Sequence, residues 1–387
     1  MKMTYPKIHP ETMANRQLPA LPRFLLIFFI GVFLLTSSCK KEPLAPEVKP
    51  ADTTFRTTGI FVLNEGVFNA NNASLTRFSF SDSIAETDYF FNKNGRKLGD
   101  TGSDLGIYGS KMYVVVNVSS QVEVMDALTC LSLKQIPMFD GDKARQPRKI
   151  AFLGNHAFVC NFDGTVAVID TTTLETVKFI QAGRNPDGIT AAYGKIWVTN
   201  SGGLGFPDYD HTVSVIDPVT LSEIKKLESG INPYTIHPDN HGNLFVIARG
   251  NYGDIKSRLQ VLDATSGEMK HTFTDFEALN FIISGDSAFV YNYDWNSGSS
   301  SIRVINTVTL EVANNAFISD GTVIESVYGI AADPFTGIIY ITDAGNFTGR
   351  GKVHAFSRSG KKLYSFDAGI NPAGIVFAGT SEITNHP

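Results

Sequence analysis

The chain has 387 residues, of which 43% are hydrophobic and 18% are charged. This composition indicates an ordered globular protein with a large core and excludes an intrinsically disordered chain. The formal net charge is -5 at pH 7, and because the sequence also lacks a basic stripe, it argues against nucleic acid as the partner.

Residues 1–38 predict an export signal. Arg23 precedes an apolar run at residues 24–35, and two serines precede Cys39. A charged flank, an apolar run too short to span a membrane comfortably and small residues at the cleavage site are typical of a secretory signal. The stretch also resembles a bacterial lipoprotein signal, although Thr36 stands where that motif more often has Leu. The resemblance implies that Cys39 becomes the lipidated first residue of the mature protein; the alternative is a signal or anchor in which this cysteine has no such role.

Residues 39–56 predict a tether between the lipid and the folded domain. The segment contains the run KKEPLAPEVKPAD, which is Pro-rich and charged and has no apolar period. A chain of this composition is extended, so it would give a lipid-anchored domain reach away from the membrane.

The two remaining cysteines, Cys130 and Cys160, fall in different parts of the repeat described next. The first lies by a turn and the second inside a predicted strand, so we expect no disulfide between them. Unpaired thiols in an exported domain are usually buried as small hydrophobic groups.

A sequence repeat that predicts four short strands occurs through most of the chain. In residues 183–226 the strands are predicted at 189–192, 195–200, 212–217 and 223–227, each rich in β-branched or aromatic residues and bounded by Gly, Pro, Asn or Asp. The second strand recurs seven times at spacings of 39 to 53 residues. Its copies end at Asn64, Asn117, Asn161, Asn200, Ala248, Asn292 and Asp343. Four strands in a period of this length predict a β-propeller.

The third strand recurs as VxVID and is followed by a turn. Copies end at Asp126, Asp170, Asp217, Asp263 and Asn306, with a weaker copy at Ser357. We interpret these acids as structural, because an Asp side chain at this position accepts hydrogen bonds from the backbone of its own turn.

The ends of the chain are predicted to close the ring. The GxNP phrase that opens a first strand occurs at Gly183 and Gly230 and again at Gly369, where nothing follows that would complete another blade. Residues 369–377 are therefore expected to join the strands at 61–64, 74–80 and 86–91 in one blade, which removes two exposed edges. The predicted fold over residues 57–387 is all-β: a seven-bladed β-propeller of four-stranded antiparallel blades.

The NPxGI and VxVID phrases resemble those of the YncE-like propellers over about residues 57–378. Together with the lipoprotein signal, they make the chain similar to propeller surface lipoproteins of Bacteroidota, some of which bind corrinoids such as vitamin B12 beside a TonB-dependent transporter. The resemblance implies a non-enzymatic binding protein, anchored by lipid in the outer membrane and facing the cell surface. Its expected partners are a corrinoid and the transporter that receives it, and no cofactor is expected.

The candidate ligand site lies on the face that carries the long loops after each second strand. These loops present aromatic side chains among Gly, Asn and Asp, a mixture suited to a large, partly polar ligand. The alternative is that each ring covers its own blade. The aromatic candidates are Phe68, Phe206, Tyr209, Tyr252, Tyr293, Trp295 and Phe347.

The starts of the first strands form the second part of the candidate site, at the mouth of the central channel. The side chains predicted there are Asp104, Arg148, Asp187, Tyr234, Asn280 and Tyr328, with Arg145, Arg184 and Arg249 close by. Guanidinium groups pair with planar oxygens, so this rim would suit phosphate or carboxamide groups. Salt bridges between blades, made with Asp163, Asp187 and Glu65, are an equally weighted alternative.

Two further functions stay open. The same loops would also serve as a platform for a protein partner in the envelope. A lactonase-like hydrolase would need a cation held by Asn64, Glu65, Asn161, Asn200 and Asp343. Asn at a strand exit also has a backbone role, so we expect neither a metal nor catalytic residues, and we expect His237 and His241 to lie in a turn on the short-loop face.

Overall fold

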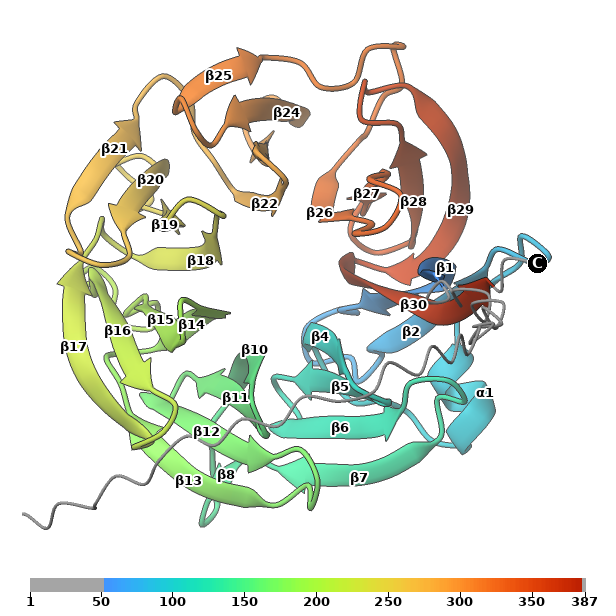
Figure 1. Cartoon of the computed structure of the whole chain (residues 1–387), viewed down its shortest axis with the longest axis horizontal. Helices are drawn as coiled ribbons and strands as arrows, with labels where there is room; N and C mark the ends of the chain where they lie inside the picture. Colours follow the sequence, from blue (N-terminus) through green and yellow to red (C-terminus); the bar gives the residue numbers. More distant parts are fainter. Residues whose placement is uncertain (1–51, 385–387) are drawn as a thin grey trace, which may run out of the picture. The chain divides into compact units, whose positions relative to one another are not determined.

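The computed structural model describes residues 52–384 and contains seven four-stranded antiparallel sheets arranged as blades around a ring (Figure 1). The predicted seven-bladed propeller is therefore confirmed. From the channel outward, blade 1 consists of β30 (Pro372–Thr384), β1 (Asp52–Asn64), β2 (Ser74–Ser79) and β3 (Ala85–Glu86). Blade 2 consists of β4 (Gly102–Tyr108), β5 (Lys111–Val116), β6 (Gln121–Asp126) and β7 (Ser132–Pro137).

The next five blades follow the chain in the same way. Blade 3 consists of β10 (Pro147–Leu153), β11 (His156–Asn161), β12 (Thr165–Asp170) and β13 (Thr176–Gln181). Blade 4 consists of β14 (Pro186–Ala192), β15 (Lys195–Asn200), β16 (Thr212–Asp217) and β17 (Ser222–Glu228). Blade 5 consists of β18 (Pro233–Pro238), β19 (Asn243–Ala248), β20 (Arg258–Asp263) and β21 (Met269–Phe273).

Blade 6 consists of β22 (Asn280–Ser284), β23 (Ser287–Asp294), β24 (Ser299–Asn306) and β25 (Glu311–Asn314). Blade 7 consists of β26 (Val327–Ala332), β27 (Ile339–Asp343), β28 (Arg350–Phe356) and β29 (Lys362–Ile370). A small hairpin, β8 (Phe139–Asp140) and β9 (Lys143–Ala144), lies between blades 2 and 3 in the chain. Within residues 52–384 no helix is both long and apolar enough to cross a membrane.

Blade 4 shows how the sequence specifies a blade. Its second strand, β15, is almost wholly buried because neighbouring blades cover both of its faces, and such strands read as continuous apolar runs. The carboxylate of Asp217, which ends β16, accepts the backbone N–H groups of Val219 and Thr220, both at 2.9 Å. The structural interpretation of the recurring acid is therefore correct for this turn.

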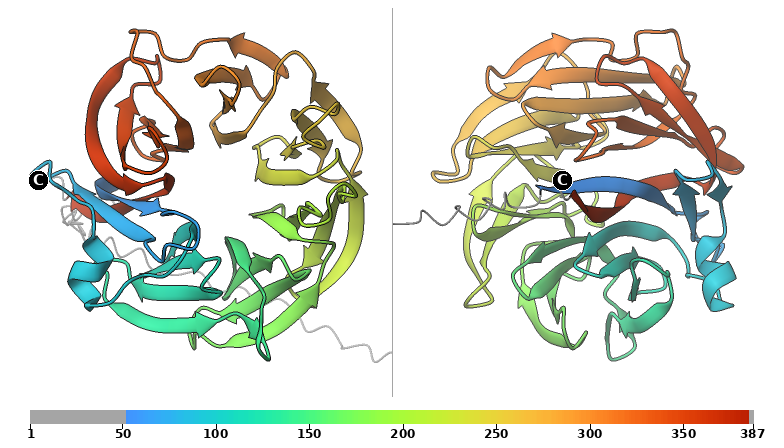
Figure 2. Two further views of the ribbon diagram at one scale, coloured as in Figure 1. Left: turned by 180° about the vertical axis from the view of Figure 1, so that it is seen from behind. Right: turned by 45° about the vertical axis from the view of Figure 1, so that its right-hand side comes forward.

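The ring closes as predicted. β30 pairs antiparallel with β1 and places Val376 opposite Phe61 and Ile375 opposite Val62. The two strands, which come from opposite ends of the chain, run side by side as the red and blue ribbons of Figure 2. Blade 1 thus combines both ends of the described chain, and β1 is paired on both sides instead of being left as a sheet edge.

The predicted outer strand of blade 1 at residues 86–91 is wrong. Only β3 forms there, and the short helix α1 (Tyr89–Asn94) follows it. Successive residues of a strand point to opposite faces, whereas α1 buries the adjacent side chains of Tyr89 and Phe90 together and ends at Gly95, which has the left-handed φ of 66°. The aromatic run satisfied the strand pattern, but burial of two consecutive rings favours the helix.

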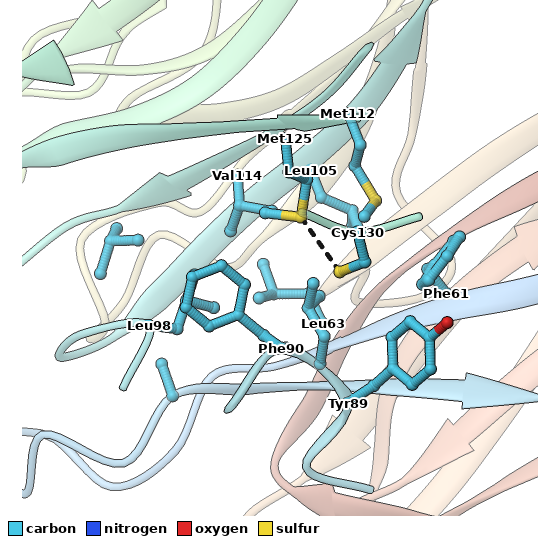
Figure 3. Close-up of a cluster of buried hydrophobic side chains, with 13 residues drawn as sticks. Phe61, Leu63, Tyr89, Phe90, Leu98, Leu105, Met112, Val114, Met125 and Cys130 are labelled. Carbon is cyan, nitrogen blue, oxygen red and sulfur yellow. Dashed lines mark hydrogen bonds between the residues drawn. The ribbon is translucent and has the colours of Figure 1, made fainter. Parts of the chain in front are cut away.

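The core lies between neighbouring blades. Figure 3 shows one cluster, in which Phe61 of β1 and Phe90 of α1 pack with Met125 of blade 2 around Cys130. The Cys130 thiol lies 3.3 Å from the Met125 sulfur. Cys130 and Cys160 are both free and buried, as predicted, and burial raises the pKa of each thiol to about 12, so both stay protonated at neutral pH.

Candidate functional site

Loops of blades 4 and 5 bring three of the predicted aromatic residues together. The ring centroids of Phe206 and Tyr209 lie 6.2 Å apart, and those of Tyr209 and Tyr252 lie 6.0 Å apart, both edge to face. Tyr209 is only 8% exposed, whereas Phe206 and Tyr252 are exposed. Tyr209 is therefore the buried ring of this cluster, and it contacts an exposed ring of its own loop and one of the next blade.

A second aromatic cluster joins blades 6 and 7. Trp295 stacks on Phe347 with a centroid distance of 5.4 Å and an interplanar angle of 25°. Tyr293 contacts both rings, at 4.8 Å from Trp295 and 5.8 Å from Phe347, and Tyr328 lies 6.2 Å from Phe347. Because Trp295 is still 70% exposed, the cluster presents a wide indole face that its neighbours hold in place.

A cavity of about 410 Å³ connects the two clusters. Tyr252 lines it on one side and Tyr293 and Trp295 on the other, while Arg249 and Leu279 also contribute to its wall. Three rings, Tyr252, Tyr293 and Trp295, line the cavity, and four more belong to the two clusters through ring contacts. We call all seven rings the aromatic arc: Phe206, Tyr209, Tyr252, Tyr293, Trp295, Phe347 and Tyr328. Phe68 is exposed on the loop after β1 and lies outside the arc.

An ion-pair triad stands beside the arc at the mouth of the channel. The Asp187 side chain, only 2% exposed, accepts a hydrogen bond of 2.8 Å from Nε of Arg148 and lies 3.6 Å from Nη1 of Arg249. Burial opposes the charge on Arg148, but attraction to Asp187 outweighs it and raises the pKa of the guanidinium. The three residues come from three successive blades, so the predicted salt bridges between blades exist at Asp187.

Aromatic rings hold both guanidinium groups of the triad in place. Arg249 lies 3.4 Å from the ring centroid of Tyr234, and Arg148 lies 4.5 Å from that of Phe162. A stacked guanidinium keeps its edges available for hydrogen bonds. Both arginines remain partly exposed, so the triad combines a structural bridge with donors that face the channel mouth.

The other two rim arginines have local partners. Arg145 pairs with Asp163 and, at 3.5 Å, with Asp140. Arg184 pairs with Asp208 at 3.0 Å and is half exposed. These pairs lie within or beside one blade, so they do not bridge blades as the pairs of Asp187 do.

Glu65 occupies the rim in a way that sequence reasoning missed. Its carboxylate accepts a hydrogen bond of 2.6 Å from the Tyr328 hydroxyl, and the Tyr291 hydroxyl donates to the Tyr328 carbonyl at 2.6 Å. Burial and the nearby Glu65 carboxylate raise the pKa of Tyr328 well above its usual range. The position of Glu65 directly after a second strand is the available signal, but it suggested a salt bridge or a cation ligand and not a tyrosine partner.

The central channel contains a separate cavity of about 400 Å³. Among its lining residues are Asp104, Lys149, His237 and Asn280, and the Lys149 ammonium lies 3.7 Å from the Asp104 carboxylate. His237 belongs to β18 and faces this cavity, so its predicted place in a turn is wrong, whereas His241 does lie in the turn after β18. Burial lowers the pKa of His237 to about 4, which keeps its imidazole neutral.

The recurring asparagines hold the blades together. Asn200 accepts the Gly183 N–H at 3.0 Å and donates to the hydroxyls of Thr212 and Ser214, both at 2.9 Å. Asn64 makes the corresponding three bonds in blade 1. In these two blades the side chain thus ties the segment before the first strand to the third strand, which supports the backbone interpretation for Asn64 and Asn200, whereas Oδ1 of Asn161 is buried without a hydrogen-bond partner. Within residues 52–384, no group of three or more His, Cys, Asp or Glu side chains could hold a metal ion.

The predicted cleavage site, the lipidation site Cys39 and most of the tether lie outside the described residues.

Comparison with solved structures finds similar folds at low sequence identity. One is a quinonprotein alcohol dehydrogenase-like protein from Bacteroides thetaiotaomicron, with a TM-score of 0.61, 16% identity, and 83% of this chain and 78% of that chain covered. Hydrazine synthase of Kuenenia stuttgartiensis gives a TM-score of 0.59 at 17% identity, covering 73% and 95%. A functionally unknown protein from Desulfotomaculum acetoxidans gives 0.59 at 14% identity, covering 83% and 99%. At such identities the likeness concerns the fold alone.

No curated protein matches the chain. A family model described as a domain of unknown function, DUF5074, matches residues 58–378, which is nearly the whole propeller. The chain therefore belongs to the DUF5074 family.

Proposed function

We propose that this protein is a binding protein of the cell envelope that captures a ligand on its long-loop face and catalyses no reaction. The aromatic arc carries the proposal. It gathers rings from four blades into two clusters, and Tyr252, Tyr293 and Trp295 of these clusters line one cavity that has the partly exposed Arg249 in its wall. Flat apolar rings beside directional polar donors suit a large ligand of mixed polarity.

The ligand that we propose is a corrinoid, and we propose that the protein passes it to a TonB-dependent transporter. The basis is the resemblance to the YncE-like lipoproteins of Bacteroidota. A corrinoid offers a wide ring face for stacking and peripheral amide and phosphate groups for hydrogen bonds. The exposed face of Trp295 and the guanidinium groups of Arg148 and Arg249 match these two needs.

Calorimetric titration with cyanocobalamin tests the ligand. We expect binding at micromolar protein, and we expect Trp295→Ala to weaken it about tenfold because a stacked ring contributes on the order of 1 kcal/mol. Phe91→Ala is the matched control, since Phe91 is an exposed ring on α1 outside the arc. A titration without heat at micromolar wild-type protein would exclude the corrinoid.

We also propose that lipid on Cys39 anchors the protein in the outer membrane at the cell surface. Two acyl chains or one chain with a second signal give stable anchoring, and a tether gives the domain reach. Labelling cells with radioactive palmitate should mark the wild-type protein and leave Cys39→Ala unlabelled. If the wild-type protein is also unlabelled, the proposed lipid anchor is excluded.

A cation-dependent hydrolase has weaker support. Three of the five side chains that it requires already use their oxygens, because the Asn64 and Asn200 amides accept backbone N–H groups and the Asp343 carboxylate accepts those of Glu325 and Ser326, both at 2.9 Å. A metal would have to displace these bonds.

A further inference from the structure

Blade 6 has an incomplete outer strand. In blade 4, β17 pairs with β16 along its whole length, from Thr212 to Asp217. In blade 6, β25 pairs only with the last three residues of β24, Val304, Ile305 and Asn306. The first half of β24, residues 299–303, therefore has no strand on its outer side, and the chain leaves β25 instead as the long segment 315–326.

The place of the missing half-strand is a groove of about 790 Å³. Ser300, Ser301 and Ile302 of β24 line one side, and residues 315–318 and 321–326 line the other. Ile302 and Ile324 are buried, whereas Val323 is exposed. The groove thus has an apolar floor and an open top.

The backbone of β24 faces this groove. The carbonyl of Ile302 accepts the Phe317 N–H at 2.9 Å on the outer side. Backbone groups of every second residue point to the same side of a strand, so the N–H and C=O of Ser300 face the groove as well. Hydrogen bonds within the chain hold this part of β24 in place, because the Ser300 hydroxyl accepts the Val327 N–H at 3.0 Å and donates to the Glu325 carbonyl at 3.2 Å.

We infer that this groove binds an extended segment of another protein, which adds to β24 beside Ser300, since the carbonyl of Ile302 already pairs with Phe317. Only an extended chain places N–H and C=O groups at the repeat that a strand edge requires, which is the basis of recognition by strand addition. Side chains on one face of the added strand would enter the apolar floor. Glu325 is the one charged residue in the lining and is exposed, so the segment carries a Lys or Arg next to it.

The groove also adjoins the aromatic arc. Tyr293 lines both this groove and the cavity between the two aromatic clusters. A bound segment would therefore touch a ring that belongs to the candidate ligand site. This inference does not depend on the identity of the ligand, because it rests on the open edge of β24.

An array of random heptapeptides probed with the full-length protein tests the inference. We expect enrichment of peptides that alternate β-branched residues and carry Lys or Arg. Ser300→Pro removes the N–H that faces the groove and should weaken binding of the enriched peptides about tenfold. Ser300→Ala is the matched control, because it removes the same hydroxyl and keeps the N–H. Lack of enrichment, or equal binding by Ser300→Pro and Ser300→Ala, would overturn the inference.

A charge reversal gives a second, independent readout if Ser300→Pro fails to fold. Glu325→Lys changes an exposed side chain and should turn the preference of the array from basic to acidic peptides. An unchanged preference would contradict the proposed place of the basic residue. A protein that dimerises in analytical ultracentrifugation, and loses this dimer with Glu325→Lys, would show that the groove binds a second copy instead of a foreign segment.

Discussion

At the scale of single residues, the channel mouth depends on one shared carboxylate. Asp187 compensates the charge of two guanidinium groups that come from different blades. The sequence predicted all three residues at the rim, since each occupies a recurrent position of the repeat. The sequence alone could not show whether these side chains bind a ligand or one another. Their pairing depends on how neighbouring blades are placed against each other, and a pattern within one blade does not contain that information.

Asp187→Asn should destabilise the fold by about 2 kcal/mol. The substitution keeps the shape but leaves two positive charges beside each other, and removing one partner of a buried pair costs about 3–5 kcal/mol when the site is fully desolvated. The arginines are partly exposed, which reduces the effect. Urea unfolding measures the change.

The matched control for that variant is Asp367→Asn, which breaks the exposed pair with Lys352 at 2.6 Å. Surface pairs contribute about 0–1 kcal/mol. Equal losses in the two variants would mean that Asp187 acts as an ordinary surface acid.

At the scale of elements, the two middle strands of a blade were easier to predict than the outermost one. The second and third strands of each blade lie in the interior of its sheet and carry continuous or alternating apolar patterns. Their bounds in blade 4 therefore agree with the prediction to the residue. Outer strands have a neighbour on one side only, and their sequences are correspondingly less restricted. Both departures from the regular blade, α1 in blade 1 and the short β25 in blade 6, occur at this outer position.

Two adjacent phenylalanines of α1 test whether this helix is part of the core. Phe90 is 1% exposed and packs into the cluster of Figure 3, whereas Phe91 is 51% exposed. Phe90→Ala should lower the free energy of unfolding by about 3–5 kcal/mol. Phe91→Ala should change it by less than about 0.5 kcal/mol. Similar losses in the two variants would show that Phe90 does not anchor this helix in the core.

At the scale of the whole molecule, the fold is a ring whose closure depends on contacts between the two ends of the chain. Blades pack through apolar clusters on both faces, so each blade stabilises two neighbours. The same regularity leaves the long loops free to differ, which is why the scaffold was predictable from repeats and the arrangement of the aromatic arc was not. The rings of the arc contact one another across blades, and sequence spacing within one blade says nothing about such contacts.

A circular permutant tests whether ring closure depends on the pairing of β30 with β1 or on the position of β30 at the end of the chain. Asp52 and Thr384 are partners at the ends of β1 and β30, so a short turn joining Thr384 to Asp52 would convert the two strands into a hairpin. New termini between Asn371 and Pro372 would then retain every strand pair of blade 1. We expect this permutant to unfold in urea cooperatively and with a midpoint close to that of the wild type, because closure depends on the pairing and not on chain order.

Deletion of residues 372–387 removes the pairing itself and exposes β1 as an edge, so it should abolish the cooperative transition or cause aggregation. A stable, monomeric deletion variant would show that six complete blades suffice, and a permutant that fails to fold would show that the original chain order is needed to close the ring.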